Sequence, residues 1–315
     1  MSSTSTQVLK ADKIWIDGKF VRWEEGQVHV MTHALHYGLG VFEGIRAYKT
    51  HDGKLSIFRL KEHVRRLFDS AQIVQLQMPF TEEQIFEACL ELLRQQKDRF
   101  SGGAYLRPIA FMGDGAMGLG AVNPTRVVIT AWDWGSYLGE KGVREGIRAK
   151  VSSFTRGHVN SIMARGKISG QYVNSILAKR EAVQSGYDEA ILLDGLGCIA
   201  EASGENVFMV SRSGVIRTPP LNMPILNGIT RDSVLTLLRA SGRTVEEVPF
   251  TRDAMYIAQE VFFTGTAAEI TPVREVDNRP IGSGTPGPIC QFVQEHYFKA
   301  VRGQDPAHAD WLAYV

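Results

Sequence analysis

The sequence predicts an α/β protein built from two units, in which much of the sheet is antiparallel. Three observations carry this prediction. The chain has 315 residues, more than a single hydrophobic core usually organises. Segments with the apolar pattern of strands are interleaved with segments of helical spacing. The aromatic and glycine-containing stretch WDWGSYLGEKG, residues 132–142, has neither period and is interpreted as the joint between the units.

The first unit is expected to be a small α/β domain at 1–131, followed by an interdomain loop at 132–143. Asp-Gly pairs favour tight hairpin turns because both residues tolerate positive φ, and Thr81 with Gln84 forms a capping box that begins a helix. The elements expected here are hairpins turning at Asp17-Gly18 and Asp52-Gly53, helices at 61–72 and within 80–96, and strands at 104–111 and 125–132.

The second unit is expected to be a large α/β domain at 144–315. Glycines that follow apolar periodic segments predict where its helices end. Its expected elements are a helix at 171–186, a strand pair at 189–202 turning at Asp194-Gly195, a helix from Ile229 to Gly242, a strand running into a loop at 260–270, and a helix at 288–301.

Composition argues against several classes of protein. Thirty-five Lys and Arg residues balance 34 Asp and Glu residues, a net charge of +1, so no basic surplus favours nucleic acid. The start of the chain lacks the apolar core of a signal peptide, and no apolar run approaches the roughly 20 residues of a membrane span. Cys89, Cys198 and Cys290 form no CxxC pair, so no metal site is expected and a cytoplasmic setting is predicted.

Lys167 lies in a Gly-Lys pair ahead of a predicted helix, which raises the question of a phosphate loop. That loop requires a glycine where Ser161 stands and a hydroxyl residue where Ile168 stands, so it is rejected. GDGAMG at 113–118 has the spacing of a dinucleotide fingerprint, but a strand rather than a helix follows it.

The remaining chemistry for a lysine among small residues is a covalent bond to a carbonyl compound. If that compound is pyridoxal phosphate, an acid must hold the pyridine nitrogen, donors must bind the phosphate, and a group must orient the phenolic oxygen. Glu201 at a strand end, Tyr172, the helix start at 228–230, and the turn containing Thr266 are candidates. Each of these features alone is more often structural than functional.

Taken together and in order, seven motifs resemble the branched-chain amino acid aminotransferases, which are pyridoxal-phosphate enzymes of fold type IV. The likeness runs from about Ile14 to past Pro272 and implies the two-domain fold-type IV architecture. The motifs are HALHYGLGVFEGIRAY, FRLKEHVRRL, AYLRP, GKISGQY, AEASGENVF, NGITRD and FTGTAAEITPV.

The resemblance implies a role for each cofactor-binding residue. Lys167 takes the place of the lysine that carries the cofactor, Glu201 that of the partner of the pyridine nitrogen, and Tyr172 that of the partner of the phenolic oxygen. Arg66 matches the phosphate-binding arginine; Arg65-Arg66 leaves open which side chain turns inward, and the HxxR spacing favours Arg66. The other implied cofactor contacts are Leu226, Gly228, Ile229, Thr230 and Thr266.

The resemblance also implies a substrate site. Tyr105 and Arg107 of YLRP would serve the substrate carboxylates, which suits the planar fork of arginine. Met117 and Leu119 match a loop that reaches in from a neighbouring subunit, whereas ordinary packing is the more common role of such side chains. The other implied substrate-binding residues are Tyr37, Phe42, Gly44, Arg46, Trp134, Tyr137, Ala267 and Ala268.

The implied activity is transamination of leucine, isoleucine and valine with 2-oxoglutarate, which gives branched-chain 2-oxo acids and L-glutamate. The implied assembly is at least a homodimer, a hexamer being the larger assembly considered. Alternatives with the same fold are D-amino acid aminotransferase, (R)-selective amine transaminase and aminodeoxychorismate lyase; FEGIRAY with YLRP favours the branched-chain type. Alternatives from other classes are a nucleotide-binding oxidoreductase and a non-enzymatic binding module.

Overall fold

A computed structural model describes residues 9–100, 102–135 and 137–315 of the chain. The chain forms two compact units. The first comprises the described residues up to Gly135 together with Lys167–Gly170 and Ala300–Val315, and the second comprises those from 137 to Gly166 and Gln171–Lys299. Both units combine helices with sheet, so the predicted α/β class is confirmed.

The boundary after Gly135 lies inside the segment interpreted as a joint, but the chain does not switch units only once. The sequence prediction placed 144–315 in one domain, whereas two of its segments belong to the first unit. Val41 forms an antiparallel bridge with Ile168, and the strand near the C-terminus pairs with a strand at 55–58. The naming of a small and a large domain stays a prediction.

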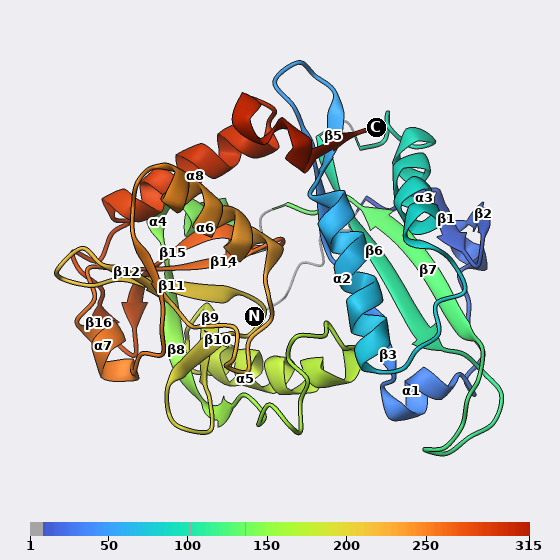
Figure 1. Ribbon diagram of the computed structural model, residues 1–315, viewed down its shortest axis with the longest axis horizontal. Coiled ribbons are helices and arrows are strands. Elements are labelled where there is room, and N and C mark those ends of the chain that lie inside the picture. Colours follow the sequence, from blue (N-terminus) through green and yellow to red (C-terminus); the bar gives the residue numbers. More distant parts are fainter. Residues whose placement is uncertain (1–8, 101, 136) are drawn as a thin grey trace. The chain divides into compact units, whose positions relative to one another are not determined.

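The first unit is built on one sheet whose strand order is β17-β5-β4-β6-β7-β1-β2, with β3 paired to β6 (Figure 1). Its strands are β1 (Lys13–Ile16), β2 (Lys19–Arg22), β3 (Gly40–Phe42), β4 (Ile45–Lys49), β5 (Leu55–Phe58), β6 (Gly103–Met112), β7 (Thr125–Trp132) and β17 (Leu312–Tyr314). Its helices are α1 (His33–Tyr37), α2 (Leu60–Ile73) and α3 (Glu82–Arg94), with short 3-10 turns η1 (Trp23–Glu25) and η3 (Pro306–Trp311).

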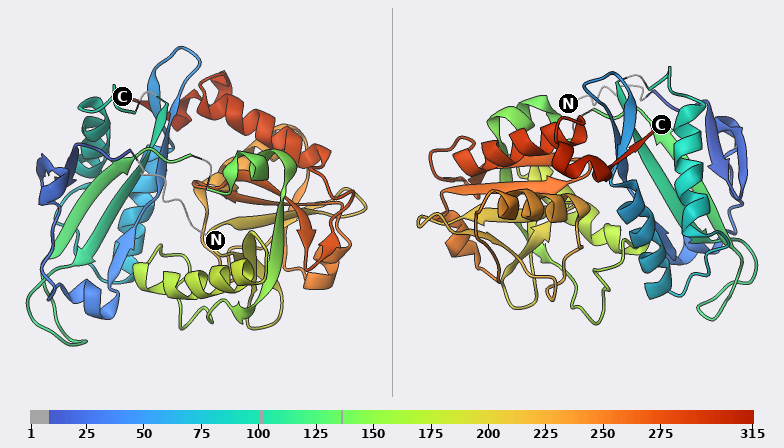
Figure 2. Two further views of the ribbon diagram at one scale, coloured as in Figure 1. Left: turned by 180° about the vertical axis from the view of Figure 1, so that it is seen from behind. Right: turned by 45° about the horizontal axis from the view of Figure 1, so that its top comes forward.

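The predicted hairpins and helices of this unit are present. Asp17 and Gly18 have positive φ between β1 and β2, and the Thr81/Gln84 capping box begins α3. Helices α2 and α3 cover one face of the sheet, as Figures 1 and 2 show. Because side chains alternate along a strand, Leu106 and Ala110 of β6 join this core while Tyr105 and Arg107 face the other side. Tyr105 and Arg107, two of the candidate site residues, therefore lie on that second face.

The second unit is built on a sheet of order β10-β9-β8-β15-β14-β11-β12-β13, with β16 paired to β15. Its strands are β8 (Ile147–Thr155), β9 (Glu189–Leu193), β10 (Ile199–Ala202), β11 (Asn206–Val210), β12 (Ile216–Thr218), β13 (Val245–Glu247), β14 (Glu260–Gly265), β15 (Glu269–Val276) and β16 (Arg279–Pro280). Its helices are α4 (Gly139–Glu145), α5 (Tyr172–Gln184), α6 (Ile229–Ala240), α7 (Arg252–Tyr256) and α8 (Pro288–Val301), and the 3-10 turn η2 (Ser169–Gln171) precedes α5.

Two features of this unit differ from the sequence prediction. The segment after Gly265 is not only a loop: it is the turn of a hairpin in which β14 pairs with β15. Residues 132–142, expected to show neither helical nor strand periodicity, also contain the start of α4. Helix α5 packs close to β9 because Ala178 and Ala182 are small and buried.

Within the described residues, no helix combines the length and the hydropathy that crossing a bilayer requires. In the same residues, no group of three or more His, Cys, Asp or Glu side chains could hold a metal ion. The GDGAMG segment connects β6 to β7 and opens no helix, which agrees with its rejection as a dinucleotide site.

Candidate functional site

In the first unit, two hydrogen bonds hold the backbone of Lys167 in place. Its N–H donates to the Ser70 hydroxyl at 2.9 Å, and its carbonyl accepts the N–H of Phe42 at 3.1 Å. The ammonium group lies 5.1 Å from the centre of the Phe42 ring. Two anchors on either side of one residue restrict where its long side chain can reach, so Lys167 is set beside an aromatic face.

Arg107 lies on the same aromatic surface. Its guanidinium carbon is 4.6 Å from the centre of the Phe42 ring and 5.6 Å from those of Tyr105 and Trp132. Its Nε is buried and has no hydrogen-bond partner among the described residues. A buried donor without an acceptor is costly, which suits a residue that meets a carboxylate when substrate binds.

The segment from Phe42 to Arg46 shapes this surface. A Cβ atom on Gly44 would overlap the Tyr105 hydroxyl and lie 2.8 Å from the Cζ of that ring, so the close approach requires glycine. Tyr105 packs edge-on against Trp134 at 4.4 Å between ring centres. Arg46 donates to the carbonyl oxygens of Trp134 and Gly135, both at 2.7 Å. These two hydrogen bonds hold the segment that follows β7 against β4.

Arg66 forms a two-pronged ion pair with Glu43. Its Nε donates to Oε1 at 2.7 Å and one terminal nitrogen donates to Oε2 at 2.8 Å, while His63 Nδ1 lies 2.7 Å from Oε2. Burial favours the neutral form of Glu43, but the charge and hydrogen bonds of Arg66, with those of His63, hold its pKa well below the ordinary value. Burial lowers the pKa of His63, against the opposing effect of Glu43. The carboxylate is therefore ionised and the imidazole neutral at pH 7.

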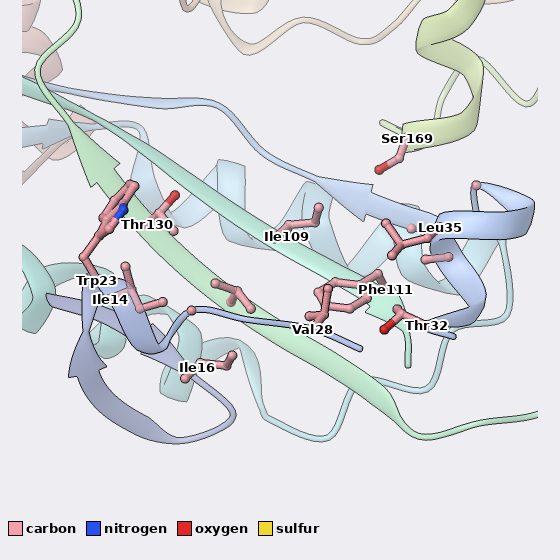
Figure 3. A pocket seen from close by; sticks show the side chains of 15 residues that line it. Ile14, Ile16, Trp23, Val28, Thr32, Leu35, Ile109, Phe111, Thr130 and Ser169 are labelled. Carbon is pink, nitrogen blue, oxygen red and sulfur yellow. The ribbon is translucent and has the colours of Figure 1, made fainter. Parts of the chain in front are cut away.

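A mostly apolar pocket of about 460 Å³ lies on the same face of the sheet (Figure 3). Ile109 and Phe111 continue the row that begins with Tyr105 and Arg107 on β6, and Ser169 comes from the segment that follows Lys167. The pocket therefore adjoins the residues predicted to bind substrate within this unit.

Three predicted substrate residues lie at the surface of this unit. Tyr37 ends α1, and Met117 and Leu119 lie in the connection between β6 and β7. His33 Nε2 lies 2.9 Å from the Gly118 carbonyl oxygen and joins α1 to that connection. Leu119 is 91% exposed, so the described part of the chain leaves it uncovered.

In the second unit, Glu201 is a buried carboxylate on β10 beside a register shift in the pairing with β9. Its Oε2 accepts the Leu226 N–H at 3.0 Å and the Asn206 amide at 3.3 Å. Arg156 Nε lies 3.0 Å from its Oε1, an ion pair in which the N–H is not aligned as a hydrogen bond. These contacts fix the orientation of the carboxylate.

Helix α6 begins after a glycine. Gly228 is its N-cap residue and supplies no capping side chain, so the first N–H groups of a 12-residue helix are not capped from within. A Cβ on Gly228 would overlap Asn206 Oδ1, and the Asn206 amide also donates to the Leu226 carbonyl at 2.9 Å. Asn206 therefore ties the segment before α6 to Glu201.

The other predicted residues of this unit lie at or near element ends. Thr266, Ala267 and Ala268 form the turn between β14 and β15, and Ala268 is buried. Tyr172 is the first residue of α5. The Tyr137 ring lies 5.2 Å from the Lys179 ammonium group.

These residues fit pyridoxal phosphate by their chemistry. The second unit provides a buried carboxylate for a ring nitrogen and an uncapped helix start for a phosphate. The first unit provides a lysine with a fixed backbone and an arginine pair. Arg107 Nε, a buried donor without a hydrogen-bond partner among the described residues, suits the carboxylate of a substrate.

Comparison with known proteins defines the class. The family described as amino-transferase class IV matches residues 40–276, about three quarters of the chain, and the chain belongs to this family. A branched-chain-amino-acid aminotransferase of Pseudomonas aeruginosa is 49% identical over 303 residues, which cover 96% of this chain and 97% of that relative.

Two solved structures agree with this relationship. A branched-chain amino acid aminotransferase from T.th. with pyridoxamine 5'-phosphate is 48% identical, with a TM-score of 0.92 over 97% of this chain and 99% of that chain. The same enzyme complexed with N-(5'-phosphopyridoxyl)-L-glutamate is 45% identical, with a TM-score of 0.90 and the same coverage. The resemblance and the fold-type IV architecture predicted from the sequence are confirmed.

The sequence prediction missed the residues that hold the predicted ones in place. Glu43 pairs with Arg66, and His63 contacts Glu43. Arg156 and Asn206 contact Glu201. Glu43 was visible inside FEGIRAY and Asn206 inside AEASGENVF, but nothing in either motif indicates which distant residue its side chain contacts. No local signal points to Arg156.

Proposed function

We propose that this chain transfers the amino group of leucine, isoleucine and valine to 2-oxoglutarate, using pyridoxal 5'-phosphate, and releases branched-chain 2-oxo acids and L-glutamate. One observation carries the proposal: a branched-chain-amino-acid aminotransferase is 49% identical to this chain over 96% of its length. The solved relatives that hold pyridoxamine 5'-phosphate and a phosphopyridoxyl-glutamate support the cofactor and the acceptor.

Lys167 is assigned the central chemical role. When bound, pyridoxal phosphate supplies an electron-withdrawing ring that accepts the electrons left on the substrate Cα. Lys167 would hold the cofactor and would act as the base and acid that moves a proton at the substrate Cα. The backbone anchors at Ser70 and Phe42 support this role because they limit how far the ammonium group can move.

The remaining cofactor contacts are assigned from the charge and the hydrogen-bond donors that each part of the cofactor requires. Glu201, held by the Leu226 N–H and the Asn206 amide, keeps the ring nitrogen protonated, and Tyr172 orients the phenolic oxygen. Arg66 and the N–H groups at the start of α6 bind the phosphate. The assigned phosphate-side residues are Arg66, Leu226, Gly228, Ile229, Thr230 and Thr266.

Arg107 is assigned to the substrate carboxylates. A single pocket must accept both an apolar side chain and the γ-carboxylate of glutamate, which an apolar wall with one arginine at its rim allows. The Phe42 ring beneath the Arg107 guanidinium supports this arrangement. The other assigned substrate-site residues are Tyr37, Phe42, Gly44, Arg46, Tyr105, Met117, Leu119, Trp134, Tyr137, Ala267 and Ala268.

The chain is proposed to act in the cytoplasm as a homodimer at least. The exposure of Leu119 and Val122, at 91% and 84%, in the connection between β6 and β7 supports a second copy on this surface. Light scattering after size exclusion measures the assembly, and a hexamer would appear as three times the dimer mass.

Borohydride reduction followed by peptide mapping tests the assignment of Lys167. The label should be found on Lys167, and Lys167→Ala protein should lose both the visible absorbance of the bound cofactor and the activity. Lys299→Ala is the control, because that lysine pairs with Glu295 on the surface of α8. A label on another lysine contradicts the assignment.

An amino-donor panel tests the substrate class. L-Leucine should be the preferred donor to 2-oxoglutarate, above D-alanine and an (R)-amine. Preference for D-alanine or the amine would replace the proposed activity with that of the corresponding transaminase, and pyruvate release from aminodeoxychorismate would identify a lyase.

A further inference from the structure

Glu43 is a charged side chain buried in the first unit with no place in the assignments above. It is fully buried, and its two oxygens contact Arg66 and His63. We propose that Glu43 is a positioning residue that orients Arg66 toward the phosphate of the cofactor. This inference rests on the proposed function, because it takes Arg66 as a phosphate ligand.

The geometry of the pair carries the argument. Arginine presents two edges that can each grip an anion with two parallel N–H groups. Glu43 occupies the edge formed by Nε and one terminal nitrogen, at 2.7 and 2.8 Å. The edge formed by the two terminal nitrogens is then turned away from Glu43 in a fixed plane. A flexible arginine thereby becomes a directed donor.

Neighbouring residues hold Glu43 itself in place. His63 Nδ1 lies 2.7 Å from Oε2, and the Glu43 N–H donates to the Pro108 carbonyl at 2.8 Å. The Ser70 hydroxyl donates to the Arg66 carbonyl at 2.7 Å and accepts the Lys167 N–H. The backbones of the assigned phosphate ligand and of the assigned catalytic lysine are thus joined through one hydroxyl group.

Two effects of Glu43 on phosphate binding oppose each other. As a negative charge it repels a phosphate, so its removal would strengthen binding if charge alone mattered. As an anchor it holds the donor, so its removal would weaken binding. The sign of the change therefore separates the two roles, and a positioning role predicts weaker binding.

The experiment is a titration of the full-length apoprotein with pyridoxal phosphate, followed by tryptophan fluorescence. Glu43→Gln places an amide NH₂ against N–H donors and should weaken binding about tenfold or more, as loss of a supporting contact behind a ligand commonly does. Glu43→Asp keeps the charge but is too short to span both nitrogens, and it should also weaken binding. Glu260→Gln is the control, since Glu260 is a buried glutamate that caps α8 through the Ile289 and Cys290 N–H groups.

A second variant shows whether Glu43 acts through Arg66. In an Arg66→Ala background, Glu43→Gln should cause no further loss of affinity, whereas independent effects would multiply. Equal or tighter binding by both Glu43 variants overturns the inference, as does multiplication in the double variant. Lower apoprotein Tm with unchanged affinity would leave Glu43 a purely structural residue and also overturns it. If Glu43→Gln does not fold, Glu43→Asp decides.

The failure of this inference is distinguishable from failure of the proposed function. If the unaltered protein binds no pyridoxal phosphate, the proposed function fails. If the unaltered protein binds it and the Glu43 variants bind equally well, only the role of Glu43 is wrong.

Discussion

Gly44→Ala should destabilise the first unit through one overlap. The φ of Gly44 is not positive, so alanine is allowed by the backbone. Its Cβ would overlap the Tyr105 hydroxyl and lie 2.8 Å from Cζ. Carbon–carbon contacts are ordinarily about 3.5–4.0 Å, so the ring must retreat by roughly 1 Å. Tyr105 is buried between Trp132 and Trp134, at 5.2 and 4.4 Å between ring centres, and has little room to move.

The magnitude follows from comparable substitutions. Overpacking a buried site costs about 1–3 kcal/mol, from which the reduced freedom of the unfolded chain returns about 0.4–1 kcal/mol. A net loss of about 1–2 kcal/mol lowers the Tm of a unit of this size by roughly 2–8 °C. Because Tyr105 is assigned to the substrate, the KM for 2-oxoglutarate should also rise.

Thermal unfolding followed by circular dichroism measures this loss. Gly195→Ala is the matched control, because no atom of the described residues lies within 4 Å of a Cβ at that turn position. Tyr105→Phe in the Gly44→Ala background removes the nearest atom and should recover part of the lost Tm. Equal Tm values for the two glycine variants, or no recovery in the double variant, would refute the overlap argument.

Three further perturbations test other parts of the structure. Arg107→Ala should raise the KM for 2-oxoglutarate about 10–100-fold and that for leucine far less, and equal increases would remove Arg107 from that role. Burial, and then the charge of Glu189, raise the pKa of Glu205 to about 8. The folded protein therefore keeps a proton that the unfolded chain loses above the ordinary value of 4.5, so stability falls as pH rises between those values. Glu205→Gln should raise Tm near pH 8 and leave it unchanged near pH 5; a uniform shift would contradict this. Thr81→Ala should cost about 1 kcal/mol in urea unfolding by removing the cap of α3, and no loss would contradict the observed capping box.

The sequence predicted features that neighbouring residues determine. Asp17-Gly18 turns a hairpin and Thr81 caps a helix because the necessary groups lie within three residues of each other. It did not predict that Val273 of β15 pairs in parallel with Ile147 of β8, since such pairing depends on packing between distant segments.

The same division applies to the candidate site. The positions of Lys167, Glu201 and Arg107 were found because their motifs resemble a family, not because their spacing indicates chemistry. The contacts that support these residues could not be inferred from the sequence. Glu43 is 23 residues from Arg66, and Asn206 is 20 residues from Leu226, so only the folded chain shows that they touch.

The pairing of β17 with β5 has a consequence for biosynthesis. Ala313 lies opposite Ile57, so a ribosome must translate more than 250 residues beyond β5 before this sheet gains its border strand. Until then β5 presents an open hydrogen-bonding edge, which is a hazard for aggregation in a nascent chain. Deleting β17, residues 312–314, should therefore lower the soluble yield.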